Sequence, residues 1–173
     1  EIDKFLEICA STNELYGPIC LYIYSMQVYT LMGKHDLALK ADVEAAKFVA
    51  PIFAAVPHYS TYMFFHGILH LEKALMDPNY SIPETVHTYM AYLGRLKAIN
   101  QANFEHKHLL LEALKSQYEG KTIEALQLFE DAILSAQKYK YVNNLGVAHE
   151  RTATLWIKEG RPHYALYHIK QAI

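Results

Sequence analysis

Two segments of the chain share one skeleton of small residues. The segment EGKTIEALQLFEDAI at 119–133 is echoed by EGRPHYALYHIKQAI at 159–173. The matched positions are Ala113, Gly120, Ala125, Phe129 and Ala132 in one copy and Ala153, Gly160, Ala165, Ile169 and Ala172 in the other. Alanine lets two helix axes approach closely, and glycine readily adopts the left-handed backbone that ends a helix. The repeat therefore predicts stacked helical hairpins, with Phe129 and Ile169 filling the space beside the alanines.

Apolar residues between these positions follow a helical period. Ile123, Leu126 and Ile133 recur at the spacing of an amphipathic helix. A weaker copy of the pattern starts at Gly33 and continues with Ala38. The sequence therefore predicts a partial helix around 2–10 and then four hairpins, at approximately 13–54, 60–100, 103–137 and 141–173.

Local signals predict some of the helix ends. Asn103 is a plausible N-cap, and Ser81 with Glu84 has the spacing of a capping box. The Gly17-Pro18 pair and Pro51 are expected to interrupt or kink the helices of the first hairpin.

Composition favours an all-α fold. The 173 residues are 52% hydrophobic and include only seven glycines and six prolines, fewer turn formers than a strand-rich chain needs. We predict one domain over 1–173, a right-handed α-α superhelix of about four hairpins. Because the chain starts at Glu1 and stops within a helical pattern, we expect it to be part of a larger protein.

Charge and cysteine content restrict the partners. The net charge is −2 and the sixteen basic residues are dispersed, so we expect neither nucleic-acid nor membrane binding. Cys9 and Cys20 are too few for a disulfide framework and are expected to be free, buried thiols. The sequence has no signal peptide and no apolar run of membrane-spanning length, so a cytoplasmic location is expected.

Histidines and serines offer few combinations for chemistry. His66 and His70 are four apart on a predicted helix and could share a metal, but the sequence fixes no acidic third ligand, so core or solvated histidines are favoured. Ser116 and Ser135 lie mid-helix without a positioned base. No phosphate-binding glycine loop is present. We expect no enzyme activity, cofactor or metal in this segment.

The tyrosines leave two alternatives open. Tyr16, Tyr22, Tyr24 and Tyr29 occupy one predicted helix and could form an aromatic ligand cage. Half-buried packing between helices is the favoured alternative, because a tyrosine can direct its ring inward and its hydroxyl outward.

The spacing of Ala113, Ala125, Phe129 and Ala132 resembles the tetratricopeptide repeat. The copies here lie forty residues apart, longer than the usual period of about 34 residues. Leu109 and His149 stand at the position where that family has tryptophan, and its closing proline is absent.

A second resemblance covers most of the chain. The runs ANFEHKHLLLEAL, GKTIEALQLFEDAI and AHERTATLWIKEGRPHYALYHIKQA are similar to the helical-repeat region of large bacterial signalling proteins. Those proteins join a Ser/Thr-kinase-like domain and a STAND-type predicted ATPase to this region, followed by a sensor domain and a histidine kinase. The resemblance implies a regulatory arm beside an ATPase switch.

In the tetratricopeptide register, the first helices of successive hairpins line a concave face. The residues expected on that face are Lys107, Leu110, Leu114, Gln117, Glu150, Thr154 and Ile157. We expect a non-catalytic segment that contacts a protein or neighbouring domains of its own chain, in an oligomeric state that the sequence leaves open. The alternatives are a ligand-sensing repeat of a STAND-class transcription regulator and an independent peptide-binding adaptor.

Overall fold

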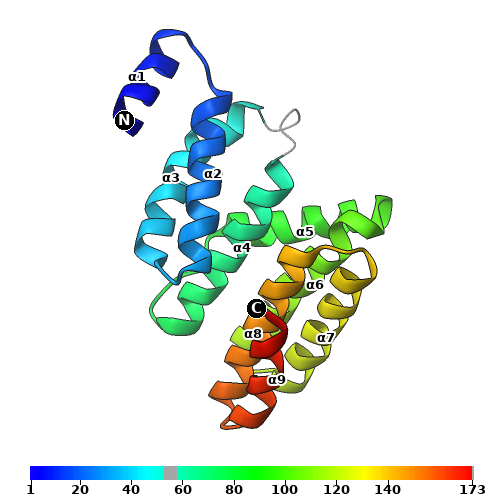
Figure 1. Cartoon of the computed structure of the whole chain (residues 1–173). Coiled ribbons are helices and arrows are strands. Elements are labelled where there is room, and N and C mark those ends of the chain that lie inside the picture. Colours follow the sequence, from blue (N-terminus) through cyan, green and yellow to red (C-terminus); the bar gives the residue numbers. More distant parts are fainter. Residues whose placement is uncertain (53–57, 173) are drawn as a thin grey trace. The chain divides into compact units, whose positions relative to one another are not determined.

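The computed structural model describes residues 1–52 and 58–172 (Figure 1). Within these residues it contains helices, turns and short connectors but no strand, which confirms the predicted all-α class. The helices are α1 (Ile2–Ser11), α2 (Tyr16–Leu31), α3 (His35–Ile52), α4 (Tyr59–Met76), α5 (Glu84–Ile99), α6 (Gln101–Tyr118), α7 (Thr122–Lys138), α8 (Val142–Lys158) and α9 (Pro162–Ala172).

The helix order agrees with that expected from the sequence. Each predicted hairpin range contains two consecutive helices, although α4 begins at Tyr59, α6 begins at Gln101 and α7 ends at Lys138, one or two residues outside the predicted bounds. Helix α1 covers the partial helix expected near the start, and the pairing of α4 with α5 as a hairpin stays a prediction. Residues 53, 54 and 173, at the ends of two predicted hairpins, lie outside the described residues. No helix in the described part combines the length and the apolar character needed to cross a bilayer.

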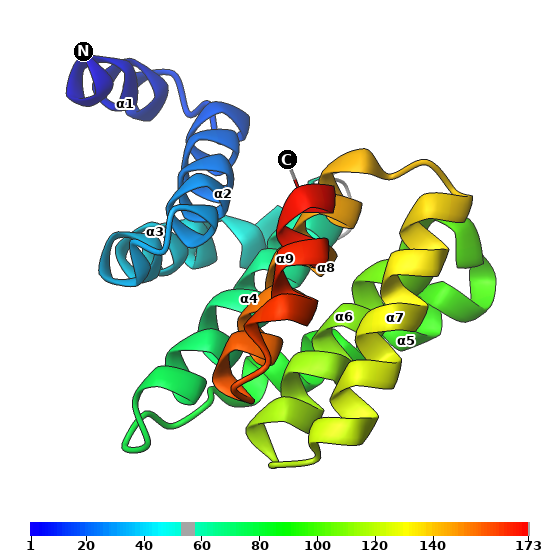
Figure 2. The ribbon, with the colours of Figure 1, turned by 60° about the horizontal axis from the view of Figure 1, so that its bottom comes forward.

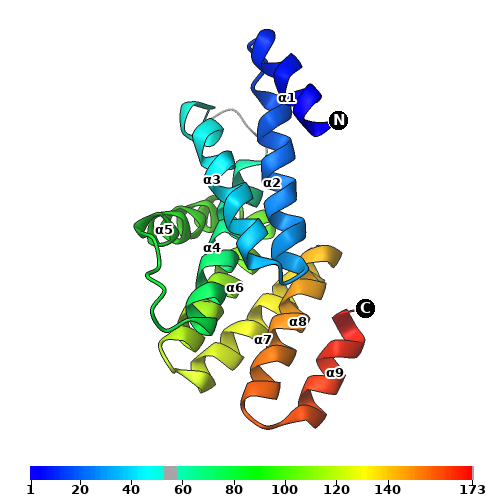
Figure 3. The ribbon, with the colours of Figure 1, turned by 90° about the vertical axis from the view of Figure 1, so that its left-hand side faces the viewer.

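Contacts between Cα atoms divide the chain into two compact units, Glu1–Leu69 and His70–Ile173. In the first unit α2 packs against α3, and Figure 3 shows the two helices antiparallel. Its two cysteines are free, with Cys9 buried and Cys20 half-buried. In the second unit α6 pairs with α7, α8 pairs with α9, and α7 also contacts α8, so neighbouring hairpins stack (Figure 2). The expectation of one domain over 1–173 stays a prediction.

Three glycines end helices as the sequence predicts. Gly33, Gly120 and Gly160 have φ of 67°, 76° and 70°. At Gly120 the amide donates to Gln117 O at 3.1 Å and the next amide, of Lys121, donates to Ser116 O at 2.9 Å, a Schellman turn. A Cβ at any of these three glycines would meet nothing within 4 Å, so backbone conformation alone selects glycine here.

Two non-glycine residues make the same turn. Asn13, between α1 and α2, has φ of 53°, and Lys140, between α7 and α8, has φ of 61°. After Lys140 the amide of Tyr141 donates to Ala136 O at 2.9 Å, the bond that follows each glycine. One turn geometry therefore recurs at five helix ends in the described residues.

The matched alanines are buried, except Ala172 near the end of α9, which is half-buried. The exposed fraction is 0% for Ala113, Ala125 and Ala132 and 3% for Ala153. Phe129 is also fully buried, but its counterpart Ile169 is 41% exposed, so the expectation that Ile169 fills the same space is wrong. The physical reason is that α7 packs between α6 and α8, whereas α8 is the principal neighbour of α9 in the described part.

Several predicted helix ends need correction. The N-cap of α6 is Asn100, whose Oδ1 accepts from the amide of Asn103 at 3.2 Å; Asn103 is not itself the cap. Helix α5 begins at Glu84 with Pro83 as its N-cap and has no side-chain cap, so the predicted Ser81 capping box does not form. The Gly17-Pro18 pair lies in the first turn of α2, where a missing backbone N–H breaks no helical bond.

Candidate interaction site

The residues predicted for the concave face fall into two groups. Helices α6 and α8 contact each other within the second unit. Of the α6 residues, Lys107 and Gln117 are half-buried, whereas Leu110 and Leu114 are only 1% and 2% exposed. Both leucines belong to the core, so they cannot line an open surface.

The predicted residues of α8 are exposed. Glu150, Thr154 and Ile157 follow the i, i+4, i+7 spacing of one helix face, and Ile157 is 57% exposed. The opposite face of α8 is buried through Ala153 and Leu155. An exposed aliphatic side chain beside a carboxylate and a hydroxyl is a mixed surface that suits another protein.

A buried arginine holds α8 in place beneath this surface. The guanidinium of Arg151 forms an ion pair with Glu72, at the C-terminal end of α4 and in the same unit, and both side chains are nearly buried. Its Nη1 lies 2.8 Å from Glu150 Oε2. Glu150 is therefore orientated by Arg151, which also neutralises part of its charge.

Lys107 occupies a different environment from an ordinary surface lysine. Burial lowers the pKa of its amine to about 8. The amine also lies 5.8 Å from the centre of the Phe104 ring. It therefore carries its charge at neutral pH and loses much of it only slightly above.

A polar network joins α6 to the start of α8. His106 Nε2 lies 2.7 Å from Asn144 Nδ2, and the His106 ring stacks on Tyr141 with centroids 4.4 Å apart. The Tyr141 hydroxyl donates to Asn103 Oδ1. Burial, with a smaller contribution from the charge of Lys107, lowers the pKa of His106 to about 4, so this imidazole is neutral at physiological pH.

A groove between α5, α6 and α7 was not anticipated from the sequence. Its volume is about 410 Å³, and α6 packs against both α5 and α7. Its lining consists of Lys97, Glu105, Leu109, Asp131, Leu134, Ser135 and Lys138. Two cations and two carboxylates therefore share one depression with two leucines.

Glu105 is the most constrained charge in this groove. Its Oε1 accepts from Gln101 Nε2 at 2.6 Å, and its Oε2 accepts from the Ser135 hydroxyl at 2.9 Å. Burial alone would raise the pKa of Glu105, but these hydrogen bonds and the charges of Lys97 and Lys138 outweigh it and lower the pKa. The carboxylate is therefore ionised, and Ser135 has a structural role as its donor.

The histidines considered for metal binding have defined partners. In the first unit His66 Nδ1 lies 2.8 Å from Asp42 Oδ1, and both side chains are buried. This acidic partner comes from α3, twenty-four residues away, so helical spacing around His66 could not reveal it. In the second unit His70 Nδ1 lies 2.5 Å from the Tyr80 hydroxyl.

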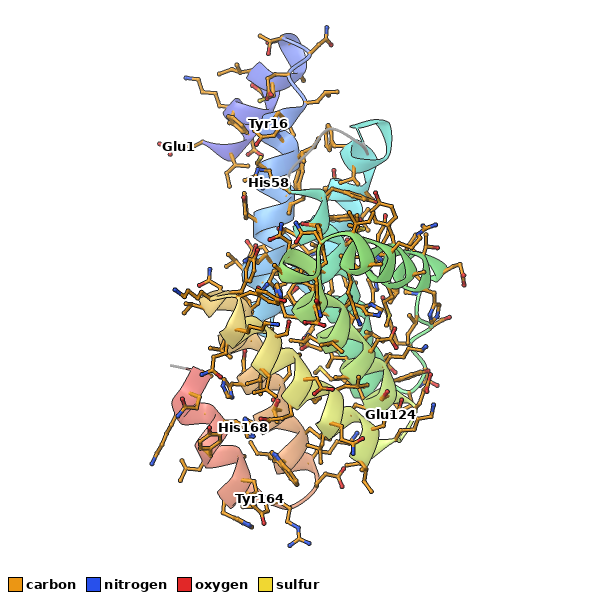
Figure 4. All side chains as sticks on the ribbon, turned by 90° about the vertical axis from the view of Figure 1, so that its right-hand side faces the viewer. Glu1, Tyr16, His58, Glu124, Tyr164 and His168 are labelled. Atoms are coloured by element: carbon orange, nitrogen blue, oxygen red, sulfur yellow. The ribbon has the colours of Figure 1, made fainter. Side chains whose placement is uncertain are left out.

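Two of the four tyrosines considered for an aromatic cage bind one histidine. The Tyr16 hydroxyl lies 2.8 Å from His58 Nε2, and Figure 4 labels both residues. The Tyr24 hydroxyl lies 2.9 Å from His58 Nδ1. Tyr22 instead stacks on Phe48, with ring centroids 6.0 Å apart. Tyr22 is half-buried, as the packing alternative expects, whereas Tyr16 and Tyr24 are exposed with their hydroxyls bound to His58, which differs from that alternative.

Comparisons with protein-family models, curated proteins and solved structures yield no match for this chain.

Proposed function

We propose that this chain is a non-catalytic helical-repeat segment whose exposed α8 face, with the half-buried residues of α6, contacts another protein or a neighbouring domain of its own chain. The stacked hairpins of the second unit support a right-handed superhelix of the tetratricopeptide type as its architecture. The resemblance of the repeat sequences supports a place within a bacterial signalling kinase or ATPase.

The observation that carries the proposal is the exposed line on α8. Glu150, Thr154 and Ile157 lie on one face of a helix whose other face is buried. Arg151 fixes the orientation of that helix from below. A rigid helix that presents an aliphatic side chain at the end of a line of polar ones offers the mixture of apolar and polar groups found in protein interfaces.

A single charged substitution tests this surface. Ile157→Glu is expected to weaken binding to the flanking kinase-like or ATPase domain, supplied as a separate chain, by about tenfold or more, since a buried aliphatic side chain contributes ~1.5–3 kcal/mol. Isothermal titration calorimetry measures the change. Glu150→Lys is a poorer choice, because it would place a second cation beside Arg151.

The matched control is Ile123→Glu. Ile123 is 76% exposed on α7, outside the proposed surface, so its replacement should leave both binding and the melting temperature unchanged. Wild-type affinity in Ile157→Glu, or equal losses in the two variants, would rule out the α8 face as the contact surface.

A further inference from the structure

The groove between α5, α6 and α7 contains charged groups of both signs, and two of them make no direct hydrogen bond or ion pair with the described residues. Lys97 on α5 and Asp131 on α7 form neither a hydrogen bond nor an ion pair with the described residues. Lys138 lies with its amine 4.9 Å from the centre of the Tyr139 ring, a contact that leaves its charge available. Oppositely charged groups are therefore held in one depression, and two of them have no direct partner.

The remaining lining gives the groove a fixed polar centre and apolar walls. Glu105 is held in position by Gln101 and Ser135. Leu109 from α6 and Leu134 from α7 contribute aliphatic surface, and Leu134 is 54% exposed. The volume of about 410 Å³ lies in the range of small-molecule sites, ~300–1,000 Å³.

We propose that this groove binds a small zwitterion with an aliphatic body, either an apolar α-amino acid or a short peptide. The carboxylate of the ligand would pair with Lys97 and Lys138, and its ammonium group would pair with Asp131, beside Glu105. The aliphatic body would lie against Leu109 and Leu134. The inference is independent of the contact surface on α8, because the groove has no residue from that helix.

The charge balance of the lining argues against ligands of a single sign. Two lysines and two carboxylates sum to zero, so a phosphate or other anion would face Glu105 and Asp131 as well as the lysines. A polyamine would likewise face Lys97 and Lys138. Only a ligand with both charges satisfies both sets of groups.

The first experiment titrates two zwitterions, L-leucine and L-alanyl-L-leucine, into the intact chain by isothermal titration calorimetry. Saturable binding of one of them is expected with a Kd below about 10 mM. Comparing the two distinguishes a free amino acid from a short peptide as the natural ligand. N-acetyl-L-leucine, which lacks the ammonium group, and L-leucinamide, which lacks the carboxylate, should each bind more weakly.

Two neutral variants then assign the charges. Asp131→Asn is expected to lower the affinity for the zwitterion about tenfold while leaving the affinity for N-acetyl-L-leucine unchanged. Lys97→Gln is expected to lower the affinity for the zwitterion by a similar factor while leaving the affinity for L-leucinamide unchanged. Glu124→Gln on α7 and Lys158→Gln on α8 remove exposed charges outside the groove and serve as controls (Glu124 is labelled in Figure 4).

Each outcome decides the proposal. Saturable binding that both groove variants weaken and both controls preserve supports a zwitterion site. Failure of both zwitterions to bind up to about 10 mM, or binding that Asp131→Asn and Lys97→Gln leave intact, overturns it. Because folding of each variant is checked by circular dichroism, a loss of binding caused by unfolding is recognised directly.

Discussion

At the scale of single residues, the turns at five helix ends of the described residues depend on one backbone conformation. Gly33, Gly120 and Gly160 adopt it without strain, whereas Asn13 and Lys140 adopt it with a Cβ present. For a residue other than glycine the left-handed region costs ~1–2 kcal/mol. Lys140 is therefore a position where the sequence does not match the backbone it has to form.

Lys140→Gly should stabilise the chain. We expect the free energy of unfolding to rise by about 0.5–1 kcal/mol, because relief of the left-handed strain exceeds the added flexibility of glycine in the unfolded state. Urea denaturation followed by circular dichroism measures the change.

Gly120→Ala is the reciprocal variant. A Cβ there meets nothing within 4 Å, so any loss reflects backbone strain alone, and we expect the free energy of unfolding to fall by about 1 kcal/mol. Changes of opposite sign in the free energy of unfolding of the two variants would confirm that both positions form the same turn. Equal signs would contradict it.

The same comparison explains which turns were predictable. The three glycine turns were found because glycine marks a left-handed residue in the sequence itself. Nothing in the identity of Lys140 indicates such a turn, and the residue lies between the predicted hairpins 103–137 and 141–173. Asn100 was passed over as a cap for a related reason: Asn103 offers the same side chain three residues later, and only the hydrogen bond distinguishes them.

At the scale of helices, the crossing of α6 and α7 rests on small side chains. Ala113, Ala125 and Ala132 are fully buried there, and Phe129 packs beside them. The periodicity of the repeat predicted these positions because a helix buries residues at regular intervals. The periodicity could not show that Leu110 and Leu114 lie in the core while Ile169 is exposed. The burial of each residue depends on whether a neighbouring helix covers its face of α6 or α9.

Ala125→Leu tests the crossing. A leucine at a fully buried alanine should force α6 and α7 apart and lower the free energy of unfolding by ~1–3 kcal/mol. The control is Ala91→Leu on α5, because Ala91 is exposed and a leucine there meets solvent. If Ala125→Leu proved as neutral as its control, the matched alanines would not be the determinant of hairpin packing.

At the scale of the whole molecule, the groove illustrates what a sequence cannot provide. Lys97, Glu105 and Asp131 come from three helices and have no common spacing, so their proximity depends on how α5, α6 and α7 pack. The exposed residues of α8 were predictable because one helix carries them all. Sites built within one element can be inferred from periodicity, and sites built across elements require the fold.

Acid stability is a property of the whole chain to which several buried histidines contribute. Burial lowers the pKa of His106, His108, His149 and His168. His149 Nδ1 lies 3.0 Å from His168 Nδ1, so the two imidazoles share one hydrogen bond, and the positive charge of His168 disfavours protonation of His149. The Tyr167 ring contacts both imidazoles, and the charge of Glu130 opposes part of the shift at His168.

The sign of the pH dependence follows from these shifts. In the unfolded chain each histidine titrates near its usual pKa of about 6.5, whereas in the folded chain it stays neutral to lower pH. The unfolded state therefore binds more protons below about pH 6.5, and stability falls as the pH drops from 7 to 5. Glu105 and Glu119 do not contribute in this window, since their lowered pKa values matter only below the usual range of a glutamate.

Denaturant titrations between pH 7 and pH 5 should show this loss, with His106 responsible for up to about 1.4 kcal/mol per pH unit because its pKa is lowered to about 4. His106→Phe removes the titrating group while keeping a ring against Tyr141, so the pH dependence should flatten even if the variant is less stable at pH 7. If His106→Phe retained the wild-type slope, protonation of His106 would not be coupled to unfolding, and the neutral imidazole inferred from its burial and its contact with Asn144 would be wrong.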